Sequence, residues 1–475
     1  MQRRKFIRNT ALMGGLTMLD PFQLTATNSL KNFPIVRTPK RQRNFESKSV
    51  ESAIEEFQKN VKDKELGWLF NNCFPNTLDT TVTFTKKNNK PDTYVITGDI
   101  DAMWLRDSSA QVWPYMAFLD QDKDLKDLIA GVINRQTQYI LKDPYANAFY
   151  NDPNKKGEWT TDHTKMLPGV HERKYEIDSL CYPIRLGYNY WKTTGDTTPF
   201  DQDWKKAIKA TLKVFIEQQE KDGSNPYSFE RTTPKGTDTR NLKGYGYPVK
   251  PVGLICSAFR PSDDSTLFSF LIPSNFFAVV SLRQAAEMIK KIEGDHSLAN
   301  ELNELADEVE TAIKKHGIVN HPKYGDIYAF EVDGYGNHLL MDDANIPSLI
   351  SLPYLDAVDK DDWVYQNTRE FVWSLDNPFF FKGKAAEGIG GPHVGLKMIW
   401  PMATTMRALT STDPNEIKEC IKTLKATHGE TGFMHETFHV DDPKNFTRSW
   451  FAWANTLFGE LLWKTYQSHP ELLEI

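Results

Sequence analysis

The sequence predicts an all-α fold, a single toroid of six helical hairpins with small β-hairpin insertions. Hydrophobic residues recur at helical spacing in about twelve stretches, whereas strand-like segments are few. No shift in composition, Ser/Gly-rich linker or run of charge divides residues 51–475, so we expect one domain there. In a toroid of paired helices, the loops at one end form a pocket, and residues that carry chemistry are expected in those loops.

Residues 1–30 are predicted to be a targeting segment. The run Gln2-Arg3-Arg4-Lys5-Phe6-Ile7-Arg8 is a twin-arginine pattern, and a weakly apolar stretch from Ala11 to Leu19 follows it. We therefore expect export to a bacterial periplasm, with a simple amphipathic N-terminus as the alternative. Residues 31–50 are basic and contain two prolines, which predicts a linker or a strap along the surface.

The helices are expected where apolar residues recur every three or four positions between polar connections that carry Gly or Pro. The clearest example runs from Asn275 to Ile292. The predicted helices are 51–62, 107–119, 123–141, 175–194, 202–221, 273–293, 296–317, 343–353, 361–374, 392–410, 413–427 and 448–467. The predicted strands are Thr80–Thr85, Thr93–Thr97, and a hairpin of Tyr324–Val332 with Asn337–Met341 around Asp333-Gly334.

The composition excludes several classes of protein. A chain with 40% hydrophobic and 12% aromatic residues is not disordered or collagen-like. The net charge is −6 and no basic block follows residue 50, so nucleic acid is a poor partner. The longest apolar run is too short to insert into a membrane. The four cysteines lie far apart, which excludes a disulfide scaffold or zinc ribbon; we expect free buried thiols, with one bridge as the alternative in an exported protein.

Four loops ahead of predicted helices combine aromatic rings with carboxylates, which is unusual for connecting segments. In the first loop, Trp104 precedes Arg106 and Asp107, and an indole beside a guanidinium and a carboxylate suits sugar recognition. The alternative is a helix N-cap at Asp107 with a neighbouring ion pair. The second loop contains Asp263 and Asp264. Either could be a cap, or an acid in an apolar pocket whose raised pKa lets it protonate a leaving oxygen.

The third loop is Gly388–Pro392, followed by His393. No Lys-Ser/Thr follows, as a phosphate-binding loop requires, so His393 is either a hydrogen-bonding partner for a hydroxyl group or a structural histidine. The fourth loop contains His435 and Glu436 and continues into an aromatic segment that begins near Arg448. The second His of a zinc-protease motif is missing. Glu436 suits a base that activates water, with a structural role as the alternative.

The coincidence of these four loops points to one reaction class. Two carboxylates without a nucleophilic Ser or Cys constellation, and without a plausible metal cage, indicate glycoside hydrolysis with no metal and no cofactor. A closed pocket would make the enzyme exo-acting, and Trp104 and Trp159 are candidates for its wall.

At these residues the sequence resembles glycoside hydrolase family 125, the exo-acting α-1,6-mannosidases. The resemblance covers roughly residues 45–470. The motifs that carry it are Met103-Trp104-Leu105-Arg106-Asp107-Ser108, Phe259-Arg260-Pro261-Ser262-Asp263-Asp264, Ile272-Pro273-Ser274-Asn275, Met341-Asp342-Asp343-Ala344-Asn345-Ile346-Pro347-Ser348-Leu349 and Trp450-Phe451-Ala452-Trp453-Ala454-Asn455.

The resemblance implies an (α/α)6 barrel and a metal-independent, inverting α-1,6-mannosidase that removes terminal mannose from oligosaccharides of the N-glycan type. It places the general acid in the Arg260–Asp264 segment, with Asp263 preferred and Asp264 left open, and the general base at Glu436. The Arg106–Asp107 pair would hold the terminal mannose. The residues assigned to sugar binding are Trp104, Arg106, Asp107, Asn345, His393 and Arg448.

Three alternatives remain at this stage. The first is another glycosidase on the same barrel, such as an α-glucosidase. The second is a polysaccharide lyase, which would need a cluster of Arg and Lys in its pocket to neutralise a uronate. The third is a catalytically inactive glycan-binding protein. The sequence leaves the oligomeric state open.

Overall fold

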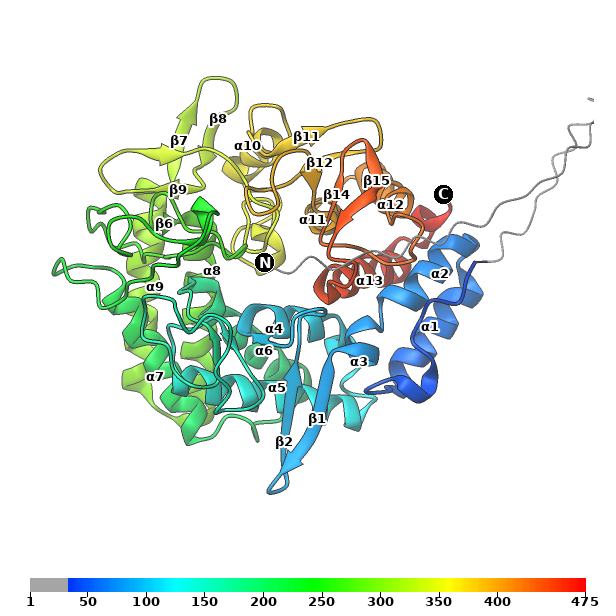
Figure 1. The fold of residues 1–475 in the computed structure, drawn as a ribbon, viewed down its shortest axis with the longest axis horizontal. Coiled ribbons are helices and arrows are strands. Elements are labelled where there is room, and N and C mark those ends of the chain that lie inside the picture. Colours follow the sequence, from blue (N-terminus) through cyan, green and yellow to red (C-terminus); the bar gives the residue numbers. More distant parts are fainter. Residues whose placement is uncertain (1–32) are drawn as a thin grey trace, which may run out of the picture. The chain divides into compact units, whose positions relative to one another are not determined.

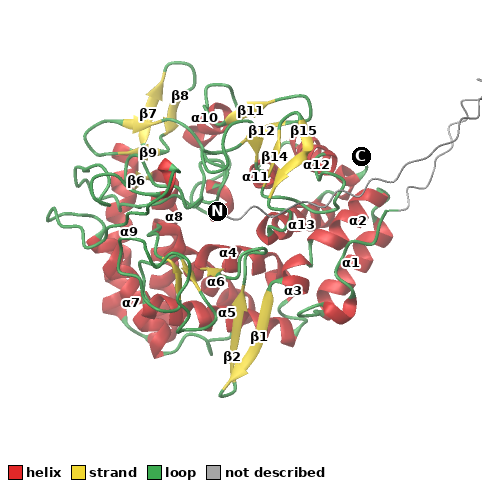
Figure 2. Ribbon diagram, viewed as in Figure 1, coloured by secondary structure: helices red, strands yellow, loops and turns green. Residues whose placement is uncertain are grey.

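The computed structural model describes residues 33–475, and within them Val36–Ile475 form one compact unit. The predicted targeting segment, residues 1–30, lies outside the described residues. Figures 1 and 2 show that this unit is built mainly from helices, with short strands in the connections between them.

The α-helices of the described residues follow one another along the whole unit. They are α1 (Lys48–Asn60), α2 (Lys64–Cys73), α3 (Asn76–Thr80), α4 (Leu105–Val112), α5 (Lys123–Lys142), α6 (Ile177–Thr194), α7 (Gln202–Glu217), α8 (Ile272–Met288), α9 (His296–His316), α10 (Trp363–Val372), α11 (Pro401–Leu409), α12 (Pro414–Ala426) and α13 (Ala452–Ser468).

The helices fall into two kinds by burial. Every residue of α4 is buried, and α8 and α13 are apolar around most of their circumference, as expected for helices enclosed by others. In contrast, α1, α7, α9 and α12 each bury one stripe. The enclosed helices contact one another: α4 lies against α6, α6 against α8, and α11 against α13. Because α13 also packs on α4, the C-terminal part of this unit meets its N-terminal part (Figure 1).

The two kinds also begin differently. Aspartate or serine side chains cap the N-termini of α1, α2, α5, α7, α9, α10 and α12 by accepting backbone N–H groups. The enclosed helices α4, α6, α8, α11 and α13 lack such a side-chain cap. Their N-cap residues are Trp104, Glu176, Leu271, Trp400 and Phe451.

Short antiparallel strands position the starts of the enclosed helices. The sheets, in strand order, are β1 (Val82–Lys87) with β2 (Lys90–Val95); β3 (Met103–Trp104), β4 (Ala148–Phe149), β5 (Val170–Glu172); β7 (Ile318–His321) with β8 (Gly325–Tyr328); β10 (His338–Leu339), β9 (Glu331–Val332), β6 (Phe270–Leu271); β11 (Phe380–Lys382) with β12 (Glu387–Ile389); and β13 (Met398–Ile399), β14 (Thr437–His439), β15 (Asp442–Thr447). Because β3 leads directly into α4 and β6 into α8, cross-strand bonds fix where these helices begin.

Two predicted helices are wrong in part. Residues 343–351 form an irregular turn instead of a helix, because the buried Asp342 carboxylate accepts the backbone N–H groups of Leu349 and Ile350. Only Leu352–Leu355 form a short 3-10 helix. Residues 392–400 form a glycine-containing turn and β13, so α11 begins only at Pro401. The periodicity also missed α2.

The predicted hairpin around Asp333-Gly334 is present as β9 and β10, but β8 pairs instead with β7. In the 31–50 segment, the buried Arg37 donates from Nε to Asp79 at 2.7 Å, which ties this segment to α3. All four cysteines are free and buried, as expected. No helix within residues 33–475 has both the length and the apolar character that crossing a membrane requires.

Candidate active site

The predicted site residues from the four loops line a single cavity of about 580 Å³. They come from the start of α4, from the segments before α8, β13 and α13, and from the residue before β14. The sequence-predicted residues in its lining are Trp104, Arg106, Asp107, Trp159, Asp263, Asn345, His393, Glu436 and Arg448. Of the predicted site residues, Asp264 alone does not line the cavity.

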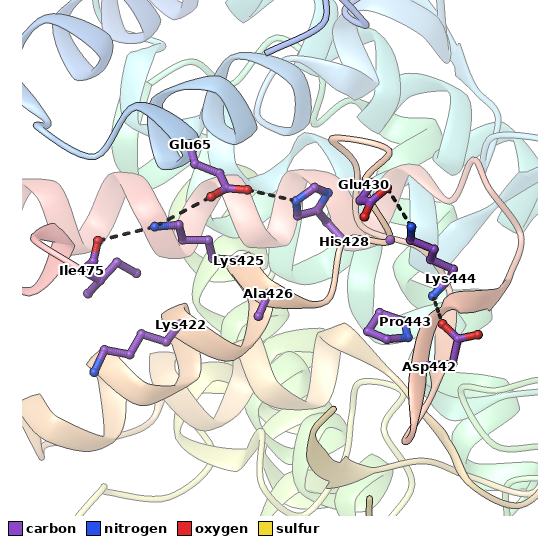
Figure 3. A pocket seen from close by; sticks show the side chains of 11 residues that line it. Glu65, Lys422, Lys425, Ala426, His428, Glu430, Asp442, Pro443, Lys444 and Ile475 are labelled. Atoms are coloured by element: carbon purple, nitrogen blue, oxygen red, sulfur yellow. Dashed lines mark hydrogen bonds and ion pairs between the residues drawn. The ribbon is translucent and has the colours of Figure 1, made fainter. Parts of the chain in front are cut away.

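A different cavity of about 600 Å³ contains none of these residues (Figure 3). It is lined by side chains of α2, α12, β15 and the loop after α12, and several of its charged groups pair with one another. His428 Nε2 lies 3.5 Å from Glu65 Oε1, and Lys444 Nζ lies 2.8 Å from Glu430 Oε2. Among the described residues, the lining of this cavity holds no Trp, Tyr or Phe side chain and none of the predicted site residues.

Arg106 organises the floor of the first cavity from the first turn of α4. Its guanidinium donates from Nη1 to Glu176 at 2.6 Å and to Asp178 at 3.2 Å, and from Nη2 to Asp263 at 3.1 Å. Its Nε lies 3.4 Å from Asp107 Oδ2. Burial raises the pKa of Asp107 to about 6, against the opposing charge of Arg106. Since the N-cap of α4 is Trp104, the alternative role of Asp107 as the cap is wrong.

The two adjacent aspartates face different surroundings. Asp263 has a positive φ of 63°, an unusual backbone conformation for this residue type, and its side chain remains 21% exposed to the cavity. Asp264 is fully buried behind the cavity wall, where its Oδ1 lies 3.1 Å from His393 Nδ1 and 3.3 Å from Lys235 Nζ. The backbone turn at Asp263 therefore separates the two carboxylates.

The expected raised pKa of an acid in an apolar pocket is wrong for both aspartates. Burial raises the pKa of Asp263, but the charges of Arg106 and Lys174 and a hydrogen bond with Glu176 bring it below its usual value. For Asp264, burial is likewise outweighed, and the hydrogen bond to His393 lowers the pKa. The pocket is polar and carries paired charges, which the composition of the loop alone did not reveal.

Glu436 belongs to the fourth loop and lies immediately before β14. Thr447 Oγ1 donates to Glu436 Oε2 at 2.8 Å, because Thr437 and Thr447 pair across β14 and β15. Arg448 Nη1 lies 3.5 Å from Glu436 Oε1, and its Nη2 lies 2.6 Å from Asp99. A strand register and an ion pair thus fix the direction of this carboxylate.

His393 and Asn345 also line the cavity, and in the sequence they lie between Asp263 and Glu436. Burial lowers the pKa of His393, but the hydrogen bond and charge of Asp264 together leave it above its usual value. Asn345 donates from Nδ2 to Asp343 at 3.2 Å, and Asp343 in turn accepts from Ser262 at 3.1 Å. Both side chains are therefore held in place by buried aspartates.

Sequence reasoning missed a second group of charged residues in the cavity, which lie on β5, on the segment after it, and on the connection between α7 and α8. Its members in the lining are Glu172, Lys174, Arg231 and Asp238; Glu176, which Arg106 contacts, does not line the cavity. The signal was present, because residues 171–178 combine several charged side chains with Tyr175 directly ahead of a helix.

The basic groups in the cavity are ion-paired. Lys174 Nζ lies 2.6 Å from Asp238, and Arg231 lies 2.8 Å from Glu172 and 3.2 Å from Asp238. A lyase needs basic groups that are available to a uronate, so this arrangement does not favour one. Within residues 33–475, no group of three or more His, Cys, Asp or Glu is arranged to hold a metal ion.

Comparison with known proteins identifies the family. A family model described as metal-independent α-mannosidase (GH125) matches residues 63–463. The Schizosaccharomyces pombe "Meiotically up-regulated gene 157 protein" is 42% identical over 469 residues, which is 94% of this chain and 91% of that protein.

Solved structures agree with this match. A Streptococcus pneumoniae structure, described as a metal-independent α-mannosidase in a non-productive complex with α-1,6-mannobiose, is 42% identical. It has a TM-score of 0.86 and covers 90% of this chain and 100% of that one. A bacterial glucoamylase complexed with acarbose, 15% identical with a TM-score of 0.50 over 78% of this chain and 50% of its own, shares only the fold. The chain therefore belongs to the GH125 family of metal-independent α-mannosidases.

Proposed function

We propose that this α-mannosidase is an exo-acting, inverting enzyme specific for terminal α-1,6-linked mannose, with Asp263 as general acid and Glu436 as general base. The observation that carries the proposal is the meeting of these two carboxylates, 173 positions apart in the chain, in one cavity with Trp104 and His393. The α-1,6-mannobiose bound to the Streptococcus pneumoniae relative supports the choice of linkage.

Asp263 is preferred over Asp264 because only Asp263 lines the cavity. Asp264 has no access to a substrate, and its contacts with His393 and Lys235 give it another task, which is to orient the histidine. In the proposed reaction Asp263 protonates the glycosidic oxygen as the bond from this oxygen to the anomeric carbon breaks.

Glu436 is proposed to take a proton from the water that attacks the anomeric carbon on the opposite face. Thr447 and Arg448 hold its two oxygens, so a lone pair can be kept aimed at one water position. An inverting enzyme needs about 6.5–9.5 Å between the two carboxyl groups to leave room for that water, whereas a retaining one needs about 5–5.5 Å.

Aromatic residues at the helix starts are proposed to close the sugar pocket. Trp104 and Trp400 are N-cap residues of α4 and α11, and both line the cavity. Trp159 lies on a loop, with its ring 3.7 Å from the Arg231 guanidinium carbon. A wall of this kind accepts the end of a glycan and supports exo action on N-glycan-type mannosides.

We also propose that the helices close into an (α/α)6 barrel. The contacts of α4 with α6, α6 with α8, α11 with α13 and α13 with α4 support an inner ring, and α5, α7 and α9 would belong to the outer ring.

The twin-arginine pattern at Arg3-Arg4 supports export to the periplasm. Cell fractionation of the wild-type protein and of an Arg3→Lys, Arg4→Lys variant tests export. If the twin-arginine pattern directs export, the variant should stay in the cytoplasm.

The experiment that tests the function is mannose release from α-1,6-, α-1,3- and α-1,2-linked mannobiose in the presence of EDTA, with the product anomer followed by NMR. We expect cleavage of the α-1,6 linkage with β-mannose appearing first. Initial α-mannose would contradict inversion, and faster cleavage of another linkage would contradict the specificity. Absence of any release would favour a glycan-binding protein.

A further inference from the structure

The proposed acid, Asp263, shares its hydrogen-bond donors with a second carboxylate, that of Glu176. Arg106 donates from Nη2 to Asp263 Oδ1 at 3.1 Å and from Nη1 to Glu176 Oε2 at 2.6 Å. Asn147 Nδ2 donates to the same two groups, at 3.2 Å and 3.5 Å. The carboxyl groups of Asp263 and Glu176 are also in hydrogen-bond contact with each other. Two carboxyl groups in such contact favour a state in which they share one proton, because adjacent like charges disfavour double ionisation.

The two members of this pair differ in their surroundings. Glu176 is the N-cap residue of α6, is 1% exposed and lies behind Asp263 as seen from the cavity lining. Asp263 faces the cavity, and the Lys174 ammonium donates to its backbone carbonyl at 2.8 Å. The buried position therefore suits the protonated member of the pair, and the exposed position suits the member that reaches a substrate.

The charges around the pair give the same order. Burial raises the pKa of Glu176 well above its usual value, and the opposing charge of Arg106 is offset by those of Asp263 and Asp178. Arg106 and Lys174 lower the pKa of Asp263. The other titratable groups that face the pair are Asp107 on α4, His171 on β5, and His393 on the loop before β13.

We propose that Glu176 is the positioning residue that supplies Asp263 with its catalytic proton, so that the Glu176–Asp263 pair together acts as the general acid. This inference rests on the proposed role of Asp263. A lone aspartate among these cations would be an ionised group that cannot protonate a leaving oxygen. The contact with Glu176 keeps one proton at the site.

The proton movements balance as follows. The glycosidic oxygen takes a proton from Asp263 as its bond to the anomeric carbon breaks, and Asp263 takes the proton of Glu176. Glu176 is left as a carboxylate that accepts hydrogen bonds from Arg106 and from Ser179, the latter at 2.8 Å. On the other face, water gives its proton to Glu436 and its oxygen to the anomeric carbon. After product release, Glu436 loses a proton to solvent and the pair regains one.

The test compares Glu176→Gln and Asp263→Asn on two substrates. One is α-1,6-mannobiose, whose leaving oxygen requires protonation; the other is 2,4-dinitrophenyl α-mannoside, whose leaving group departs without it. We expect Glu176→Gln to lower kcat on mannobiose by about 10²-fold, within the range for loss of general acid catalysis, and to change kcat on the activated substrate less than about 5-fold. Glu176→Asp, which keeps the carboxyl group, should restore part of the activity on mannobiose.

The pH profile gives a second readout that a purely structural role would not move. In wild-type enzyme the pair retains its proton at neutral pH, whereas in Glu176→Gln Asp263 faces Arg106 and Lys174 alone. The alkaline limb of kcat/KM on mannobiose should therefore shift to lower pH by at least about one unit.

A matched control is Glu172→Gln, since Glu172 also accepts from Asn147, at 3.1 Å, but pairs with Arg231 instead of Asp263. Its effect should be equal on the two substrates. Asp263→Asn is expected to lose only its activity on mannobiose. Given that result, the inference is overturned if Glu176→Gln slows the hydrolysis of both substrates equally, or if it leaves the alkaline limb of the pH profile in place. If Asp263→Asn keeps mannobiose activity, the proposed acid itself is wrong. Thermal unfolding of each variant shows that the comparison concerns folded enzyme.

Discussion

At the scale of single residues, Glu436 is the side chain on which the proposed mechanism depends most directly. Glu436→Gln keeps the size of the side chain and its contact with Thr447 but removes the lone pair that accepts a proton from water. We expect kcat on α-1,6-mannobiose to fall by about 10²–10⁴-fold, while the dissociation constant for mannose changes little. Steady-state kinetics and calorimetric titration with mannose measure the two quantities. A variant with near-wild-type kcat would contradict the proposed base.

His393 provides a second test at this scale, because Asp264 controls its charge. Asp264→Asn removes the charge of the aspartate and should lower the pKa of His393, since the hydrogen bond and charge of Asp264 are what raise this pKa. A smaller fraction of the imidazole would then be protonated at neutral pH, and a weakened hydrogen bond to the sugar would raise KM by about 10-fold. NMR titration of the His393 ring and kinetics on mannobiose check both effects. An unchanged titration would contradict this control by Asp264.

The sequence pointed to the cavity residues because acids and tryptophans in loops before helices have few structural uses. It did not separate Asp263 from Asp264, since the difference lies in one positive φ that turns the first toward the cavity and the second toward His393. Nor did it find Glu176, whose partner Asp263 lies 87 positions away and shares Arg106 and Asn147 with it. Tertiary contacts of this kind leave no periodic trace in a sequence.

At the scale of elements, the close approach of the chain before β3 to the start of α13 helps to place Arg448 and Glu436. Gly98 has φ +134°, and a Cβ there would lie 2.2 Å from the backbone oxygen of Trp450. We expect Gly98→Ala to lower the free energy of unfolding by about 1–3 kcal/mol and to reduce kcat/KM on mannobiose, because the strand bridge from Gly98 to Phe451 would move. Thermal unfolding and kinetics measure both.

The matched control is Gly223→Ala, at a glycine with φ +76° and nothing within 4 Å of the added Cβ. It shares the backbone strain but not the steric contact, so it should cost stability without a matching loss of activity. Equal loss of activity in the two variants would contradict the positional argument for Gly98.

Long periodic helices such as α5 and α9 were predicted well because their apolar stripes persist over many turns. The prediction failed at 343–353 and at 392–400, where apolar residues at similar spacing fold as turns around buried polar groups. Asp342 is the reason in the first case, because its carboxylate binds two backbone N–H groups that a helix would use otherwise. Burial raises the pKa of this carboxyl group to about 8, which is a cost that only the folded chain reveals.

At the scale of the whole compact unit, the ion pairs that Arg37 makes with Asp79 and Glu51 join segments remote in sequence, and we call this set of ion pairs the clasp. Arg37 donates from Nε to Asp79 Oδ2 at 2.7 Å and from Nη2 to Oδ1 at 3.2 Å, and it also pairs with Glu51. Arg37 and Asp79 are both buried, so removing one partner leaves an uncompensated charge. Replacing Arg37 by methionine should therefore lower the free energy of unfolding by about 3–5 kcal/mol at neutral pH.

The pH dependence of this loss has a definite sign. Burial already raises the pKa of Asp79, and loss of Arg37 removes the main group that lowers it. In Arg37→Met the raised pKa makes ionised Asp79 unfavourable in the folded state, so stability is regained as the pH falls through that pKa. Carboxyl groups with a raised pKa titrate between about pH 4 and 8. Urea unfolding over this range should show that the free energy of unfolding of the variant approaches that of wild type at the acid end. The double variant Arg37→Met, Asp79→Asn should be more stable than Arg37→Met at neutral pH and should lack the gain in stability that Arg37→Met shows, relative to wild type, as the pH falls, because the charge is gone. If the double variant is no more stable, the clasp acts through packing of the Arg37 side chain and the buried charge of Asp79 is compensated by Arg43, whose Nε lies 3.6 Å away.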